Sequence, residues 1–223
     1  MDDAINMVPS KEKITLKTLK SSEREARRNI IIDAAERVFA TKPFDKASMR
    51  EIANESGMSA SSIYRFFPNQ EALIVAAAVR ATKNLTDTME QKIARYNDDP
   101  EKAFEMMVNS FIDYISENDT FFRMMTILMS QGNINPHSSR EIVKAMNVIL
   151  DMLDPLFIAL NYTQNTRTLS RHFFTSMIGI IVAYNKLPRG SRRNMVELMK
   201  QLARMSYELI INCPREKLEL LIT

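Results

Sequence analysis

A short stretch between residues 48 and 65 combines the side chains that proteins use to bind nucleic-acid phosphates and bases. Hydroxyl groups gather at the start of one predicted helix, and an arginine lies on either side of them. Backbone N–H groups at a helix start bind phosphate, and a guanidinium group matches the O6 and N7 acceptors of guanine together. The residues left outside the predicted core are Arg50, Ser59, Ala60, Ser61, Ser62, Tyr64 and Arg65. This stretch therefore predicts a helix that reads the major groove of DNA.

Two short helices are predicted to position these side chains. The first opens at Ser48, whose spacing to Glu51 is that of a capping box, and the second opens at Ser59. Two short helices that cross closely require a small residue, here Ala53, and a turn residue that accepts positive φ, here Gly57. An amphipathic helix precedes them and ends before residue 43. The apolar side chains expected to close the small core are Ile52, Met58 and Ile63.

Residues 22–73 resemble the N-terminal module of the TetR-type transcriptional regulators. After a first helix with an A-x-x-x-F core, that module reads roughly (S/T)-x-R-x-I-A-x-x-x-G-(V/M)-S-x-x-(S/T)-(L/I)-Y-x-x-F-x-(S/N)-K-E-x-L. The chain has SMREIA at 48–53, GMS at 57–59, SIYRFFPN at 62–69 and EAL at 71–73. The run through Y-x-x-F-P-N-x-E-x-L makes the resemblance specific.

The resemblance implies that the helix from Ser59 is the recognition helix. Base edges or their borders would be faced by Arg50, Ala60, Ser61 and Arg65. Phosphates would be held by Ser48, Ser62 and Tyr64. The family's phosphate-binding lysine is Gln70 here, and its frequent histidine is Phe66, so we expect weaker salt dependence than is usual. Serines at helix starts are also caps, so the cap role and the contact role coincide at these positions.

The composition predicts an all-α protein. Four glycines and eight prolines in 223 residues leave few turns for a many-stranded sheet. Caps and prolines predict helix starts near residues 22, 48, 59, 69, 100, 119, 138, 165 and 191. We expect a flexible tail over residues 1–20, whose lysines either follow a polyanion or are simply solvated. The resemblance then implies a helix-turn-helix DNA-binding domain over 21–70 and a helical effector-binding and dimerisation domain over 71–223.

Several other classes of protein are excluded. The formal net charge is only +3, so bulk charge decides nothing. The four glycines are scattered, which excludes Gly-rich nucleotide loops, and the single Cys213 permits no internal disulfide. No apolar run is long enough to span a membrane, and the polar start lacks the apolar segment of a secretory signal. We expect a cytoplasmic protein that binds no membrane and needs no cofactor.

The sixteen methionines indicate a cavity that accepts varied apolar molecules, since flexible thioethers tolerate repacking. Methionines at helical spacing are also ordinary core residues, and that alternative stays open. The resemblance favours the cavity, because the variable C-terminal domain of the family often binds a small hydrophobic effector. The predicted effector pocket comprises Phe104, Met107, Phe111, Phe122, Met125, Met129, Met146 and Met177.

Two apolar stripes near the end of the chain predict either a dimer interface or a face of the chain's own core. In the final helix, apolar residues step by three and four, as in a coiled-coil seam. The resemblance implies that these two helices form a four-helix interface between two copies, which suits a two-fold symmetric DNA site. The predicted interface comprises Phe173, Ile180, Tyr184, Met195, Leu198, Leu202, Met205 and Leu209.

The hypothesis is a homodimeric DNA-binding transcriptional regulator, more a repressor than an activator, released from double-stranded DNA by a small apolar effector. One alternative is a helical carrier of hydrophobic ligands, which would not bind DNA at physiological salt. A helical enzyme is the other alternative, but no metal or nucleophile spacing supports it. The polar residues that such an enzyme would have to use are His172, Asp113, Tyr114 and Tyr184.

Overall fold

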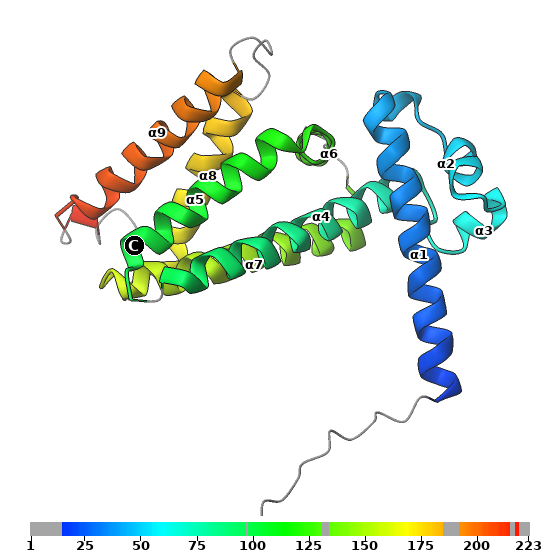
Figure 1. The fold of residues 1–223 in the computed structure, drawn as a ribbon, viewed down its shortest axis with the longest axis horizontal. Helices are drawn as coiled ribbons and strands as arrows, with labels where there is room; N and C mark the ends of the chain where they lie inside the picture. The colour runs from blue at the N-terminus through cyan, green and yellow to red at the C-terminus, as the bar shows by residue number, and fades with distance from the viewer. Residues whose placement is uncertain (1–14, 97, 131–133, 185–191, 215–216, 219–223) are drawn as a thin grey trace, which may run out of the picture. The chain divides into compact units, whose positions relative to one another are not determined.

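The computed structural model describes residues 15–96, 98–130, 134–184, 192–214 and 217–218, and every regular element in these ranges is a helix (Figure 1). The chain divides into two compact units, Met1–Pro68 and Asn69–Thr223. The division falls two residues before the predicted one. No helix in the described ranges is long and apolar enough to cross a membrane.

The first unit is a small helical domain around the buried half of one long helix. Its elements are α1 (Leu16–Thr41), the 3-10 turn η1 (Phe44–Lys46), α2 (Met49–Ser56) and α3 (Ala60–Tyr64). α1 packs against α2, and the rings of Phe39 and Phe44 lie 4.7 Å apart between their centroids. The core contains Ile31, Ala35, Val38, Phe39, Ile52, Ala53 and Ile63. Apolar spacing in α1 and α2 thus builds the platform for α3.

The first helix begins earlier than predicted. α1 starts at Leu16 because Thr15 and Thr18 form a reciprocal capping box: the hydroxyl of each accepts a hydrogen bond from the other's backbone N–H. The prediction of a tail through residue 20 is therefore wrong for residues 16–20, and residues 1–14 lie outside the described ranges. A threonine replaces the usual Glu or Gln at the third helical position, so the sequence signal was weak.

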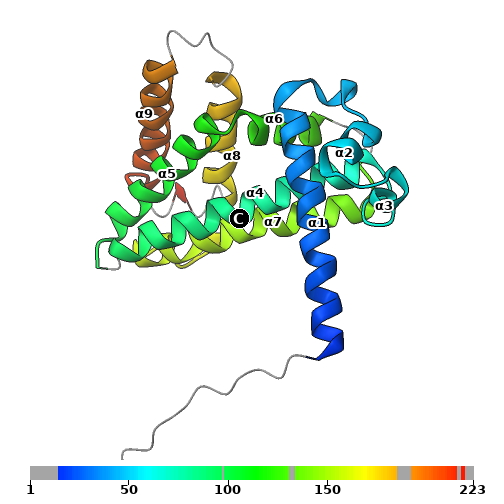
Figure 2. The same cartoon turned by 45° about the vertical axis from the view of Figure 1, so that its right-hand side comes forward.

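The second unit consists of longer helices around an aromatic core. Its elements are α4 (Gln70–Ile93), η2 (Ala94–Tyr96), α5 (Pro100–Glu117), α6 (Asp119–Ser130), α7 (Pro136–Ala159), α8 (Thr166–Tyr184) and α9 (Arg192–Ile211). α4 and α7 run side by side, and α8 packs against α9 (Figure 2). Phe104 of α5 lies 5.3 Å from Phe157 of α7 and 4.8 Å from Phe173 of α8, measured between ring centroids. These edge contacts join three helices in one core.

Candidate nucleic-acid interface

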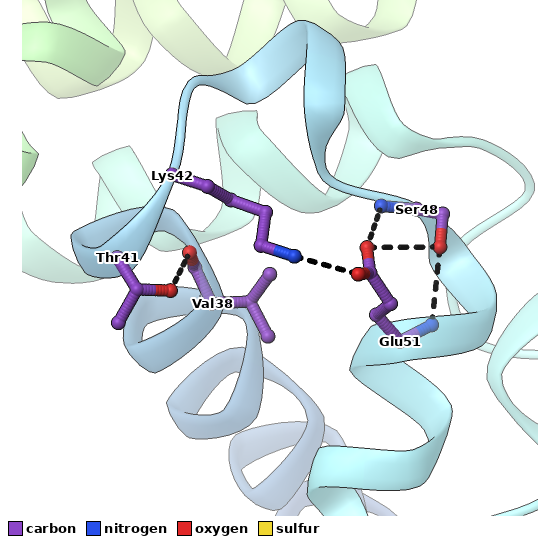
Figure 3. Close-up of polar contacts among 5 residues, drawn as sticks. All are labelled: Val38, Thr41, Lys42, Ser48 and Glu51. Atoms are coloured by element: carbon purple, nitrogen blue, oxygen red, sulfur yellow. Dashed lines mark hydrogen bonds and ion pairs between the residues drawn. The ribbon is translucent and has the colours of Figure 1, made fainter.

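The start of α2 is fixed by a hydrogen-bonded network around Glu51 (Figure 3). The Ser48 hydroxyl accepts from the Glu51 backbone N–H at 3.2 Å, and one carboxylate oxygen of Glu51 accepts from the Ser48 backbone N–H at 3.0 Å. The other oxygen accepts from Lys42 Nζ at 2.6 Å. The hydrogen bond from Lys42, followed by those from Ser48, lowers the pKa of Glu51. This network ties the end of α1 to the start of α2.

The same network limits what Ser48 can do for a phosphate. The only hydroxyl proton of Ser48 is directed at Glu51 Oε2, 3.1 Å away. A phosphate oxygen therefore has to replace that carboxylate oxygen before Ser48 can donate to it. Arg50 lies two residues further along, in the first turn of α2, and its side chain is exposed.

The turn between α2 and α3 has the conformation that the sequence predicts. Gly57 has φ of 67°, in the left-handed region, and its N–H donates to the carbonyls of Ala53 and Asn54. A Cβ atom added at Gly57 would meet nothing within 4 Å. Glycine is therefore required by backbone conformation and not by lack of space.

α3 begins with a cluster of serine hydroxyls. Ser59 caps the helix by accepting from the Ser62 N–H at 3.2 Å, and its hydroxyl lies 3.0 Å from that of Ser61 and 2.8 Å from that of Ser62. Ile63 is fully buried and anchors the helix, whereas Tyr64 is 52% exposed. Ser61 and Arg65 are also exposed, and Ala60 and Ser62 are half-buried. The residues of α3 that are predicted to contact DNA are thus exposed or half-buried, whereas Ile63 is in the core.

Gln70 is the one predicted DNA contact outside this unit. It is the first residue of α4, in the second unit, and it is half-buried. The helix start is capped by Asn69, whose Oδ1 accepts from the Ala72 N–H at 2.8 Å.

Sequence reasoning missed two aromatic contacts made by the first half of α1. The guanidinium of Arg24 lies 6.0 Å from the centroid of the Phe66 ring, and that of Arg28 lies 5.3 Å from the Phe67 ring. Arginine above an aromatic face is attracted by the ring quadrupole. The sequence does carry a signal for these contacts, because Arg24 and Arg28 lie four residues apart and continue the apolar stripe of α1.

A separate apolar cavity lies within the second unit. Side chains of α4, α5, α6, α7 and α8 line it, and almost all of them are apolar. Among its described lining residues, the polar ones are Thr82 and Thr126, which donate their hydroxyl protons to the carbonyls of Ala78 and Phe122, each at 2.9 Å. Five of the predicted pocket residues line the cavity: Phe111, Phe122, Met125, Met129 and Met146. This lining matches a hydrocarbon ligand.

The other three predicted pocket residues lie elsewhere. Phe104, Met107 and Met177 are buried in the core and do not line the apolar cavity. Phe104 lies seven residues before Phe111, which is about 10 Å along the helix axis. Helical spacing placed these residues on a buried face, but could not say where along that face the cavity opens.

The predicted dimer stripe of α9 is distinct from the face that α9 turns to its own core. The core face is formed by Met199, Ala203, Tyr207 and Ile210. Met205 and Leu209 of the stripe are 59% and 73% exposed. The other residues of the stripe, Met195, Leu198 and Leu202, are half-buried, and so are the predicted interface residues Ile180 and Tyr184 of α8. Phe173 is a correction, because it is fully buried among the rings of the chain's own core.

Neither histidine has a metal-binding neighbourhood. His137 and His172 are both exposed, and no cluster of three or more potential metal ligands occurs among the described residues.

Comparison with known proteins supplies the family of this module. The family described as "Bacterial regulatory proteins, tetR family" matches residues 31–77. The HTH-type transcriptional activator FasR of Mycolicibacterium smegmatis is 28% identical over 102 residues, which are 46% of either chain. The chain thus spans about half the length of the curated relatives it matches.

Solved structures share the fold over more of the chain. Bacillus subtilis FadR, a transcriptional regulator in complex with stearoyl-CoA, has a TM-score of 0.62 at 16% identity over 82% of this chain and 97% of its own. Thermus thermophilus FadR, a TetR-family repressor in complex with lauroyl-CoA, also has a TM-score of 0.62 at 16% identity, over 80% and 92%. The capped α2, the Gly57 turn and the α3 surface lie within the segment that matches the tetR family, so residues 31–77 are similar to the helix-turn-helix module of these regulatory proteins, and most of the chain shares the fold of the two FadR structures.

Proposed function

We propose that the protein is a DNA-binding transcriptional regulator that recognises a two-fold symmetric site as a homodimer. The observation that carries the proposal is the α2–Gly57–α3 module, which leaves Ser61, Tyr64 and Arg65 exposed on a buried platform. Arg50 and Arg65 are the proposed guanine readers, with Ala60 and Ser61 at their border. Ser62, Tyr64 and Gln70 are the proposed phosphate contacts, and Ser48 joins them if it exchanges its bond to Glu51.

The dimer is proposed on the exposed stripe of α9. Met205 and Leu209 lie four residues apart on α9 and are largely exposed, and Val182 of α8 is 44% exposed as well, so an apolar patch is open to a partner here. Burying this stripe against a second copy gives two recognition helices related by a two-fold axis. Half-sites one turn of DNA apart, about 34–36 Å, suit that symmetry.

The effector is proposed to be a molecule with a hydrocarbon chain, and the regulator a repressor. The apolar cavity supports this proposal, because both of its hydroxyl groups are already bonded to backbone carbonyls. Two proteins of the same fold hold stearoyl-CoA and lauroyl-CoA. The effector would favour a dimer state whose recognition helices no longer match the half-site spacing, and release follows from its differential affinity for the two states.

Selection of binding sites from random duplex DNA at physiological salt tests the proposal. A palindromic motif is expected, and Arg50→Ala and Tyr64→Ala should weaken binding to it while the dimer stays folded. Lauroyl-CoA, added to the complex, should then release the DNA. If no sequence is enriched, even with ligand-stripped protein, the regulator assignment is wrong and a carrier of hydrophobic ligands becomes the better assignment.

A further inference from the structure

The face of α1 that packs against the helix-turn-helix continues beyond it as a row of lysines and arginines. Within the buried half, this face carries Ile31, Ala35 and Val38. Steps of three and four residues continue it towards the N-terminus without a break, through residues 28, 24, 20 and 17. Figure 1 and Figure 2 both show α1 extending past α2 and α3. The exposed half thus presents cations where the buried half presents apolar side chains.

Charge in this half of α1 is sorted by face. At about 100° per residue, all the cations between residues 16 and 30 fall in one sector about 100° wide. The acidic Glu23 and Glu25 and the exposed Leu16, Leu19 and Ile30 fall outside it. A merely solvated helix needs no such sorting. The cations are Lys17, Lys20, Arg24, Arg27 and Arg28. We use the name basic face for Lys17, Lys20 and Arg24 together with Arg65.

The basic face adjoins the end of the recognition helix. Arg24 lies over the ring of Phe66, the residue that follows Arg65 in the sequence. One surface hollow joins the two helices and is lined by Lys20, Glu23, Arg24, Arg27, Arg65 and Phe66. α3 and the exposed half of α1 therefore share a continuous surface inside one compact unit.

Part of the positive charge is neutralised within α1 and part is not. Arg27 pairs with Glu23 at 2.6 Å, and Arg28 pairs with Glu25 at 3.5 Å. Lys17, Lys20 and Arg24 form no ion pair with any described carboxylate. Three exposed cations on one helix face, next to a helix that reads DNA, complement a row of phosphates.

We propose that the basic face binds backbone phosphates of duplex DNA beside the bases that α3 reads. The proposal rests on the proposed function and extends its DNA site by the exposed half of α1, about 20 Å of helix at 1.5 Å per residue. The cations of the basic face replace the positive charge that is missing at Gln70 and Phe66, where the family pattern has a lysine and often a histidine. The salt dependence of binding is therefore strong, contrary to the expectation from residues 66 and 70 alone.

The test compares salt titrations of DNA binding for the unmodified chain and for Lys17→Gln combined with Lys20→Gln. Glutamine keeps the helix propensity, and both lysines are exposed, so the fold should not change. For each phosphate that the variant no longer binds, the slope of log K against log salt should fall by about 0.9, and affinity at 0.15 M salt by about fivefold. The selected sequence motif should not change, because phosphate contacts carry no base information.

A matched control removes the same charge elsewhere. Lys92→Gln combined with Arg95→Gln lies in the second unit, also on exposed residues, and should leave the slope unchanged. Glu23→Gln should have the opposite effect to the lysine variant, because it frees Arg27 for a phosphate and steepens the slope.

The outcomes separate this inference from the function on which it rests. If the unmodified chain selects a palindromic site and the lysine variant keeps its slope, the basic face does not touch DNA and this inference is wrong. If the control lowers the slope equally, general charge and not this face is responsible, and the inference is again wrong. Absence of any selected DNA overturns the regulator assignment and this inference together.

Discussion

Tyr207 places a hydroxyl group in the interior of the second unit without a hydrogen-bond partner. The residue is 8% exposed, and its ring lies against that of Phe104, with 4.3 Å between centroids and 32° between the ring planes. Tyr162 is different, because its hydroxyl donates to the Ile211 carbonyl at 2.9 Å and so ties the start of the α7–α8 connection to the end of α9. The two tyrosines therefore allow a paired test of what a buried hydroxyl contributes.

We expect Tyr207→Phe to leave the free energy of unfolding unchanged or to raise it by up to about 1 kcal/mol, since it removes a buried group that has no partner. Tyr162→Phe should lower it by about 1 kcal/mol, because the Ile211 carbonyl is then left without its donor. Urea unfolding at neutral pH measures both. A larger decrease for Tyr207→Phe than for Tyr162→Phe would show that the Tyr207 hydroxyl has a partner in solution.

The pH dependence of stability provides a second test of the buried hydroxyl of Tyr207. Burial, followed by the charges of Glu101 and Glu208, raises the pKa of Tyr207 from 10.0 to about 12. The folded state then holds this proton after the unfolded state has released it, so the stabilisation is complete below pH 10 and is lost between pH 10 and 12. Stability measured over that range should fall less steeply in Tyr207→Phe than in the unmodified chain.

The two described glycines predict opposite effects of the same substitution. Gly57→Ala forces a side chain into the left-handed region at φ of 67° and should cost about 1 kcal/mol of stability. Gly179→Ala, inside α8 with nothing within 4 Å of the added Cβ, should gain about 0.5–1 kcal/mol. Thermal unfolding, with the oligomeric state checked, gives both signs; stabilisation by Gly57→Ala would contradict the turn geometry.

At the scale of the element, α9 separates an inward face from an exposed apolar stripe. Met205→Lys combined with Leu209→Lys should convert the proposed dimer to monomers, because charge replaces the most exposed apolar side chains of the stripe. Sedimentation velocity reports the mass. Gln201→Lys, at another exposed position of α9, is the matched control and should remain dimeric. A dimer that survives the double change would place the interface on another surface.

At the scale of the whole molecule, the proposed regulation requires that a ligand in the apolar cavity changes the affinity for DNA. Ala145 lines the cavity from α7, so Ala145→Leu should fill part of it and raise the lauroyl-CoA concentration needed for DNA release by about tenfold, or 1.4 kcal/mol. DNA affinity without ligand should be unchanged. Ala159→Leu makes the same change at an exposed site of α7 and should release normally. Equal release by both variants would show that the ligand binds elsewhere.

The sequence by itself determined the helical fold and the helix-turn-helix module, because their signals are local. A cap at Ser48, positive φ at Gly57 and a small residue at Ala53 each act within a few residues of the chain. The tetR family match over residues 31–77 covers the same segment. Eight of the nine predicted helix starts lie within two residues of a helix start in the structure, for the same reason.

Only the tertiary structure decided which partner each helix face has. Apolar spacing predicted both Phe173 and Leu209 as interface residues, yet Phe173 is fully buried in the chain's own core and Leu209 is 73% exposed. It also could not separate the cavity residue Phe111 from the core residue Phe104. Periodicity defines a face, whereas contact depends on helices distant in sequence. For the same reason, only the folded helix shows that the cations of α1 lie in line beside Phe66 and Arg65.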